Sequence, residues 1–226
     1  MWDGKRKAVT FSYDDGIVQD IRLVEILNRY GIKCTFNLNS GIMGPQSAWE
    51  YKGTPVRRLS PDEMKGLYDG HEIAVHCTTH ANLCGLSEQR LAEEILEDRK
   101  RLEEQFSCRI SGMAYPYGAY DETVVNYLRA NGFAYGRTVN GTGTTELPAG
   151  DLLMLRPTAH HDREDLFDII DRFLSGEETQ LLYIWGHSYE FDGNHNWDRL
   201  EEICRRLSGR EDVFYGTNRQ VLEQYF

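Results

Sequence analysis

The chain has 226 residues, of which 40% are hydrophobic and 12% aromatic; this is enough for a sizeable core, and we expect a single domain spanning residues 1–226. Its 25 basic and 36 acidic residues give a net charge of −11, which disfavours nucleic acid and anionic membranes as partners and favours a neutral or cationic substrate. No apolar run approaches the ~20 residues of a membrane helix, and neither a signal-peptide pattern nor a CxxC pair occurs. We therefore expect a cytoplasmic protein with free thiols, with a mature secreted form that has lost its leader as the alternative.

Segments with strand character alternate with helical patterns along almost the whole chain. We expect strands near residues 7–13, 32–38, 71–75, 109–115, 133–138, 152–155, 181–185 and 213–216. We expect helices near residues 17–30, 61–69, 88–106, 121–131, 164–175, 197–207 and 218–226. Repeated β-then-α units predict a mostly parallel sheet that is covered by helices. With seven or eight strands in one domain, the sequence favours a closed or nearly closed (β/α) barrel, and a doubly wound open sheet is the alternative.

Local signals refine this pattern at a few points. Residues 60–63 (Ser-Pro-Asp-Glu) and 217–220 (Thr-Asn-Arg-Gln) each combine an N-cap with the glutamate or glutamine of a capping box. The stretch 41–56 contains glycine, proline and tryptophan without periodicity. We expect it to be a long loop over one end of the barrel.

The first expected strand ends in two adjacent carboxylates, Asp14 and Asp15, followed by Gly16. Neighbouring side chains of a strand point to opposite faces, so both can serve one site only where the strand gives way to a loop. Gly16 permits that turn, and two close carboxylates usually require a nearby cation or a raised pKa. The structural alternative is an ordinary Asp-Gly turn.

Two histidines, His76 and His80, follow the apolar strand at 73–75. Histidines four residues apart can face one point from a helical turn or a tight loop, which is a common spacing for metal ligands. With Asp15 as a third ligand, they would leave an open position for water, as is typical of catalytic zinc sites. The alternative is two unrelated polar residues after a strand.

Two further clusters lie after expected strands: Tyr117 in the sequence Tyr-Pro-Tyr-Gly, and His187 in the sequence Trp-Gly-His-Ser. The carboxyl ends of the strands of a parallel barrel form one rim, and active sites lie on that rim. This shared position favours a common site. Taken singly, Pro-Tyr-Gly is often only a turn, and a strand-end histidine is often structural.

Five motifs, in order along the chain, resemble those of the polysaccharide deacetylases of the NodB-homology type, carbohydrate esterase family 4. The family motifs TFDDG, HS/TxxH and RxPYG are matched by residues 12–16, 76–80 and 114–118. The fourth and fifth motifs are matched loosely, by the residues from Arg156 onward and by residues 182–187. The resemblance covers nearly the whole chain.

The resemblance implies a distorted (β/α)7–8 barrel of the NodB type, classed as α/β, and a metal-dependent hydrolase that removes N- or O-linked acetyl groups from a carbohydrate. Carried over by position, Asp15, His76 and His80 would bind one divalent metal ion. Zn²⁺ is the expected ion for such ligands, with Co²⁺, Ni²⁺ and Mn²⁺ as alternatives.

The same resemblance implies that Asp14 is the general base and His187 the general acid, while a backbone N–H near Tyr117 joins the metal in stabilising the oxyanion. The acetylated substrate can be a chitin oligomer, peptidoglycan, xylan or a small amino sugar. Two alternatives stay open: hydrolysis of another non-peptide C–N amide bond on the same fold, and a catalytically inactive carbohydrate-binding protein.

The chain departs from the family pattern at Ala114, where the third motif usually carries an arginine. That arginine is expected to orient or charge-balance the catalytic aspartate. We hypothesise that Arg156, at another strand end, replaces it. The alternative is an ordinary surface arginine.

Three aromatic residues are candidates for stacking on a sugar: Trp49, Trp185 and Tyr189. For Trp185, at the end of a core strand, packing is the alternative. The adjacent pair His160 and His161 is expected to lie in a loop near the rim without a metal, because adjacent histidines rarely bind one ion.

Overall fold

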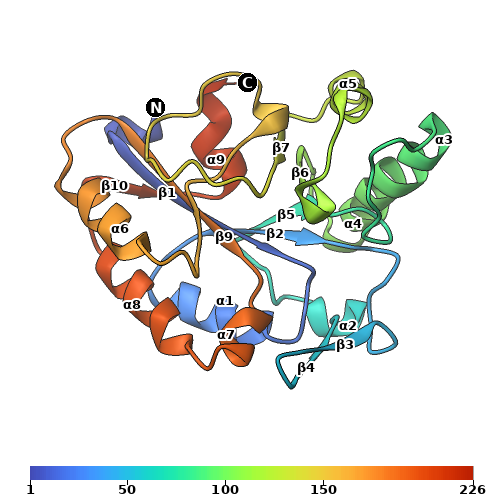
Figure 1. The fold of residues 1–226 in the computed structure, drawn as a ribbon, viewed down its shortest axis with the longest axis horizontal. Helices are drawn as coiled ribbons and strands as arrows, with labels where there is room; N and C mark the ends of the chain where they lie inside the picture. Colours follow the sequence, from blue (N-terminus) through green and yellow to red (C-terminus); the bar gives the residue numbers. More distant parts are fainter. Residues whose placement is uncertain (226) are drawn as a thin grey trace.

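The computed structural model describes residues 1–225, and its centre is an eight-stranded sheet whose strand pairs are parallel (Figure 1). The strands are β1 (Lys7–Asp14), β2 (Cys34–Leu38), β5 (Glu72–Val75), β6 (Gly112–Ala114), β7 (Tyr135–Arg137), β8 (Ala159–His160), β9 (Gln180–Gly186) and β10 (Val213–Tyr215). Their order is β7-β6-β5-β2-β1-β9-β8, and β10 pairs with the first residues of β1. The sheet curls into an incomplete barrel that is open between β7 and β8, so the expected distorted (β/α) barrel is confirmed.

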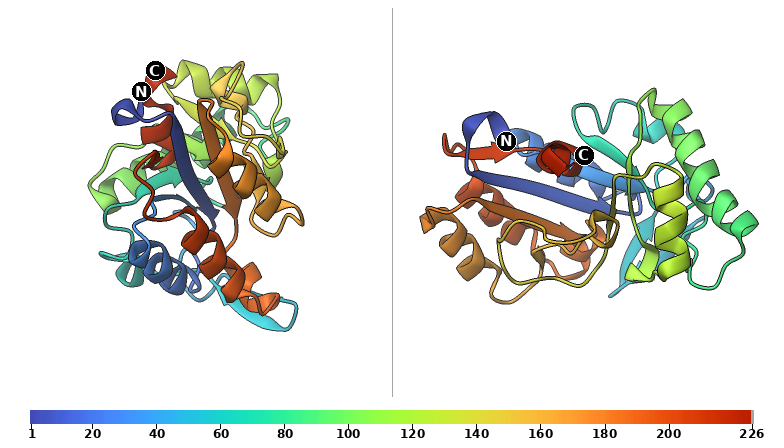
Figure 2. Two further views of the ribbon diagram at one scale, coloured as in Figure 1. Left: turned by 90° about the vertical axis from the view of Figure 1, so that its left-hand side faces the viewer. Right: turned by 90° about the horizontal axis from the view of Figure 1, so that it is seen from above.

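Helices cover the outside of the curled sheet, and Figure 2 shows β1 and β9 running side by side through the middle of the molecule. The α-helices are α1 (Asp20–Arg29), α2 (Pro61–Met64), α3 (Glu88–Leu91), α4 (Glu97–Phe106), α5 (Glu122–Ala130), α6 (Leu166–Ser175), α7 (Tyr189–Gly193), α8 (Trp197–Leu207) and α9 (Asn218–Leu222). The capping boxes predicted at Ser60 and Thr217 are both formed. No helix among the described residues is both long and apolar enough to cross a membrane.

Strand β1 is buried along its whole length, and its side chains alternate between two environments. Phe11 and Tyr13 belong to the apolar core that packs against the helices. Ser12 and Asp14 instead make polar contacts in the barrel interior. Asn218 of α9 reaches this interior from the other end of the barrel, and its amide donates to Ser12 Oγ at 3.3 Å. The first strand therefore carries a polar column that ends at Asp14.

Two sequence predictions about strands and loops are wrong. Residues 152–155 do not form a strand: the Asp151 side chain accepts the Leu153 N–H and caps a 3₁₀ turn, Leu152–Met154, and only Leu155 bridges to Arg137. The expected loop at 41–56 contains most of an antiparallel hairpin, β3 (Ala48–Tyr51) and β4 (Thr54–Arg57).

Smaller differences concern helix ends. The helix expected at 61–69 ends at Met64, and the helix expected at 218–226 ends at Leu222 before a 3₁₀ turn, Glu223–Tyr225; residue 226 lies outside the described residues. The helix expected at 88–106 contains a π-helical turn, Ala92–Leu96, between α3 and α4.

Candidate active site

The two adjacent aspartates reach one rim because β1 ends between them. Asp14 is the last residue of the strand, and Asp15 takes a left-handed φ of 82° before Gly16 at 62°. The left-handed φ of Gly16 favours glycine, and a Cβ there would also lie 2.8 Å from Leu38 Cδ2. Both carboxylates are buried. This change of backbone direction therefore points the Asp15 side chain toward the rim that Asp14 also faces.

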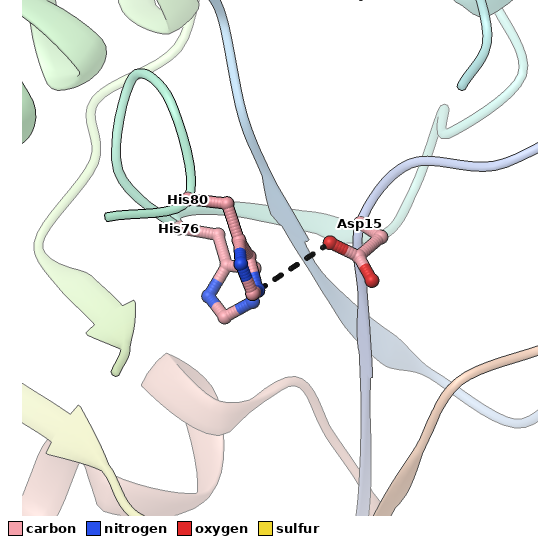
Figure 3. A group of neighbouring side chains, drawn as sticks. All are labelled: Asp15, His76 and His80. Carbon is pink, nitrogen blue, oxygen red and sulfur yellow. Dashed lines mark ion pairs between the residues drawn. The ribbon is translucent and has the colours of Figure 1, made fainter. Parts of the chain in front are cut away.

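Asp15 shares this rim with His76 and His80, as expected (Figure 3). One ligand atom from each of the three residues lies within 4.8 Å of the other two, and Asp15 Oδ1 is 3.7 Å from His80 Nε2. His76 Nδ1 lies 2.8 Å from the Ala114 carbonyl and donates to it, which leaves the Nε2 lone pair free. Positive φ values at Cys77 (67°) and His80 (58°) fold the segment between the histidines into a tight loop.

The electrostatics of these groups suit a divalent cation. Burial lowers the pKa of His76, and it lowers the pKa of His80 to about 4, so both imidazoles are neutral at neutral pH. Burial raises the pKa of Asp15, but the nearby His187, His76 and Arg58 outweigh it and lower that pKa overall. Two neutral imidazoles and one carboxylate form a donor set that fits a catalytic zinc site.

Arg58 is a charged neighbour that the sequence did not reveal. Its Nη2 donates to Asp15 Oδ1 at 2.8 Å, and its guanidinium lies 4.9 Å from the ring centroid of Trp49. Arg58 directly follows β4, a strand of the hairpin that the sequence analysis did not predict. Its place at the site could therefore not be predicted either.

Asp14 has one anchored oxygen and one that faces the histidines. Oδ1 accepts from Asn37 Nδ2 at 2.8 Å and from the guanidinium of Arg137. Oδ2 lies 3.9 Å from His76 Nε2 and 3.8 Å from His187 Nε2. Burial raises the pKa of Asp14, but Arg137 and the two histidines lower it to about 2, so the carboxylate is ionised at neutral pH.

The prediction that Arg156 pairs with Asp14 is wrong. Arg156 is exposed and donates to the carbonyls of Asn140 and Gly141 instead. The partner of Asp14 is Arg137, which is fully buried and is the in-register neighbour of Ala114 across β6 and β7. Arg137 thus lies beside the place from which the family's arginine would project. The sequence feature that could have identified Arg137 is the presence of an arginine in a short strand that is otherwise expected to be buried.

His187 follows β9 on the same rim and faces two carboxylates. Its Nε2 faces Asp14, and its Nδ1 is 3.4 Å from Glu190 Oε2, which also accepts the His187 backbone N–H at 2.9 Å. Burial lowers the pKa of His187, but Glu190 and Asp14 outweigh it and raise that pKa to about 9. Sequence reasoning missed Glu190, whose only signal was its position three residues after the histidine.

The prediction that His160 and His161 lie in a loop is wrong for His160, which belongs to a short strand, β8, that was not predicted. His160 is the last residue of β8, and its Nε2 lies 3.0 Å from Glu190 Oε2. Its Nδ1 accepts the Asp162 N–H at 3.2 Å, which leaves the ring proton on Nε2, facing the carboxylate. His161 is fully buried, with Nδ1 3.1 Å from Tyr13 Oη. These rings pack around Glu190 and fix its position.

The aromatic candidates divide into two groups. Trp49 and Tyr51 of the hairpin pack against Tyr189, with ring centroids 5.7 and 4.9 Å away, so Trp49 and Tyr189 form one wall of the rim. Tyr117 is 68% exposed, and its ring lies 4.7 Å from that of His80. Trp185 is buried under the guanidinium of Arg137, which favours its packing alternative over sugar stacking.

A curled parallel barrel with carboxylates and imidazoles gathered at the carboxyl ends of its strands is an architecture of barrel enzymes. Residues 3–136 match the family model described as polysaccharide deacetylase, which is more than half of the chain, and the chain belongs to that family. The resemblance inferred from the sequence motifs is therefore confirmed.

Individual relatives are more distant. YxkH of Bacillus subtilis (strain 168) is 25% identical over 134 residues, which cover 58% of this chain and 44% of YxkH, so the chain spans less than half the length of this relative. The Xyl-CE4 domain of a multidomain xylanase from the hindgut metagenome of Trinervitermes trinervoides has a similar fold, with a TM-score of 0.62, 16% identity and coverage of 97% of this chain and 91% of that one. BA3943 of Bacillus anthracis, a CE4 family pseudoenzyme, is also similar in fold, with a TM-score of 0.57, 13% identity and coverage of 97% and 66%. At these identities the solved structures support the fold alone.

Proposed function

We propose that this protein is a metal-dependent deacetylase that removes N- or O-linked acetyl groups from a carbohydrate. The observation that carries the proposal is the convergence of Asp15, His76 and His80 beside two further groups, Asp14 Oδ2 and His187 Nε2. A binding protein has no need of all five groups at one point. Since β10, near the end of the chain, pairs with β1, we further propose that residues 1–226 form one catalytic domain.

A divalent ion held by Asp15, His76 and His80 would supply Lewis-acid activation of water and of the acetyl carbonyl. Zn²⁺ suits this donor set, and Co²⁺, Ni²⁺ or Mn²⁺ can take its place. Arg58 would hold Asp15 in its orientation through the contact to Oδ1. The backbone near Tyr117, a residue with a φ of 59°, would donate an N–H to the oxyanion.

The protonation states of Asp14 and His187 suit opposite roles. Asp14, with a pKa of about 2, is ionised at neutral pH and would accept the proton of the attacking water at Oδ2. His187, with a pKa of about 9, is protonated and would donate from Nε2 to the departing amine or alcohol. Two titratable groups whose environments drive their pKa values apart are typical of an acid–base pair. Arg137 would hold Asp14 in position, and Glu190 would hold His187.

The aromatic residues of the rim, the half-buried Trp49 and Tyr189 and the exposed Tyr117, would bind the sugar. Trp49 and Tyr189 form a wall on one side of the candidate metal ligands, and Tyr117 lies against His80. Aromatic faces suit the apolar faces of sugar rings. We propose an acetylated carbohydrate as the substrate on this ground and on the family's name.

The test is acetate release from a panel of acetylated sugars by protein stripped of metal and then reloaded with one Zn²⁺. Asp14→Asn should retain the ion but lose ~10²–10⁴-fold in turnover, as is usual for a general base. Asp15→Asn should lose the ion itself, and Asp69→Asn, a change at an exposed carboxylate, should behave as wild type. Metal bound with no acetate released from any acetylated sugar would overturn the proposal, and equal metal retention by both variants would overturn the division of roles.

A further inference from the structure

The loop that carries His76 and His80 packs against the helical segment formed by α3 and α4, beside β5 and β6 in Figure 1. This segment is not a continuous α-helix, because the π-helical turn Ala92–Leu96 separates its two parts. Such turns contain one extra residue and are frequent at functional sites.

The π turn frees a backbone carbonyl for the histidine loop. The Glu97 N–H donates to Ala92 O, five residues back, whereas in an α-helix it would donate to Glu93 O. Glu93 O instead accepts the hydroxyl of Thr78 at 2.7 Å. The next carbonyl, Glu94 O, accepts the Thr78 N–H at 2.9 Å. The Thr78 hydroxyl also lies 3.4 Å from Glu94 O, so this residue of the loop is bonded to the turn through both its backbone and its side chain.

The carboxylate of Glu94 holds the next loop residue. Glu94 is buried, its Oε2 accepts the Thr79 N–H at 2.9 Å, and its Oε1 accepts the Thr79 hydroxyl at 2.7 Å. One turn further on, the buried Asp98 accepts the His76 N–H at 3.3 Å. We refer to these contacts of Glu93, Glu94 and Asp98 as the helix clamp.

The histidine loop needs such support. Cys77 and His80 both have left-handed φ values, which are unfavourable for residues with a Cβ and persist only where the surroundings enforce them. The imidazoles of His76 and His80 project from the two ends of this loop. If the loop relaxed, their nitrogens would move apart. The hydrogen bonds of the clamp end on His76, Thr78 and Thr79, so it would act on the candidate ligands through the loop.

We propose that the π turn positions the candidate metal ligands and that Glu94 is the positioning residue that sets metal affinity. The inference rests on the proposed role of His76 and His80 as ligands. Partners that orient ligands from behind typically contribute 10–100-fold to metal affinity. Because the turn contains one inserted residue, both the free carbonyl of Glu93 and the carboxylate of Glu94 face the loop.

The experiment is a Co²⁺ titration of the full chain in competition with a chelator, with the visible spectrum of the bound ion recorded. Glu94→Ala and a deletion of Glu93, which would convert the π turn to an α turn, should each weaken Co²⁺ binding ~10–100-fold. Glu94→Gln keeps a carbonyl oxygen that can accept the Thr79 N–H and should restore most of the affinity. Glu93→Ala is the matched control, since it retains the backbone carbonyl and should bind as wild type.

Melting of the metal-free proteins separates positioning from folding. A merely structural role would lower the melting temperature and leave the affinity of the folded protein unchanged. If Glu94→Ala does not fold, Thr79→Val removes one of the same bonds from an exposed position and should weaken binding in its place. Unchanged Co²⁺ affinity in the folded variants would overturn the clamp while leaving the proposed function intact. A wild-type chain that binds no Co²⁺ would overturn the proposed function and the clamp with it.

Discussion

Replacing Arg137 by methionine tests the buried ion pair that holds Asp14. The side chain of Arg137 has 0% exposure, and its guanidinium contacts Asp14 Oδ1. Removing one partner of a buried pair costs about 3–5 kcal/mol, because the other charge stays behind uncompensated. For a chain of this length each kcal/mol lowers the melting temperature by about 2–4 °C, so a fall of about 6–20 °C is expected in a thermal scan.

The same substitution should change the pH dependence of acetate release. Burial alone raises the pKa of Asp14, and Arg137 is the largest of the charges that lower it to about 2. Without Arg137 this pKa rises, so the acid limb of the profile, where Asp14 becomes protonated and can no longer accept a proton, moves to higher pH. Because the carboxylate also loses its anchor, we expect turnover at neutral pH to fall ~10²-fold, the lower end of the range for a general base.

Two further proteins control this experiment. Arg156→Met changes an exposed arginine and should leave both the melting temperature and the profile unchanged. Adding Ala114→Arg to Arg137→Ala places the guanidinium on the neighbouring strand at the same register, as in the family pattern, and should recover part of the lost turnover. Wild-type stability together with an unshifted acid limb in Arg137→Met would refute the reasoning.

Three other predictions concern single residues. His71 Nδ1 accepts the Cys34 N–H at 3.2 Å, and burial lowers the pKa of His71 from 6.5 to about 4. On acidification the unfolded chain therefore binds a proton at His71 before the folded chain does, and the free energy of unfolding should fall by about 2–3 kcal/mol between pH ~6.5 and ~4. Urea unfolding of His71→Asn should lack this loss. Glu190→Gln removes a charge that raises the pKa of His187, so the basic limb of acetate release should move to lower pH; an unmoved limb would contradict the pairing. A Cβ at Gly112 would lie 1.9 Å from Tyr135 Cζ, so Gly112→Ala should lose ~1–3 kcal/mol in urea unfolding, and a neutral result would show that the ring can move away.

The sequence predicted the parts of the site that lie where expected strands end. Asp14 is the last residue of β1 and Asp15 follows it, while His76 and His187 directly follow β5 and β9, and the rim of a parallel barrel brings such positions together. The partners of these groups were not predictable in the same way. Arg137 closes a strand of only three residues, too short to show a period.

The remaining errors have local physical causes. The apolar run Leu152–Leu155 has the composition of a strand, but the side chain of Asp151 accepts the Leu153 N–H and caps a 3₁₀ helix, Leu152–Met154. The hairpin formed by β3 and β4 has strands of four residues and a proline, Pro55, in its second strand, which weakens any alternating pattern. The π turn leaves no trace in composition, because one inserted residue only rotates the pattern of buried positions.

The polar column of the barrel interior makes the far end of the chain part of the surroundings of Asp14. Asn218 donates to Ser12 Oγ, which also accepts from Asn37, and Asn37 in turn donates to Asp14. Ser12, Asn37 and Asn218 are all buried, so α9 covers the end of the polar column that lies opposite Asp14. A low dielectric in such a buried interior strengthens the ion pair of Asp14. The segment matched by the family model ends at residue 136, before Arg137, β9 and α9. A fragment cut at that boundary would keep the bond from Asn37 to Asp14 but would lack Arg137 and α9, so its Asp14 would lose the ion pair and the end of the polar column.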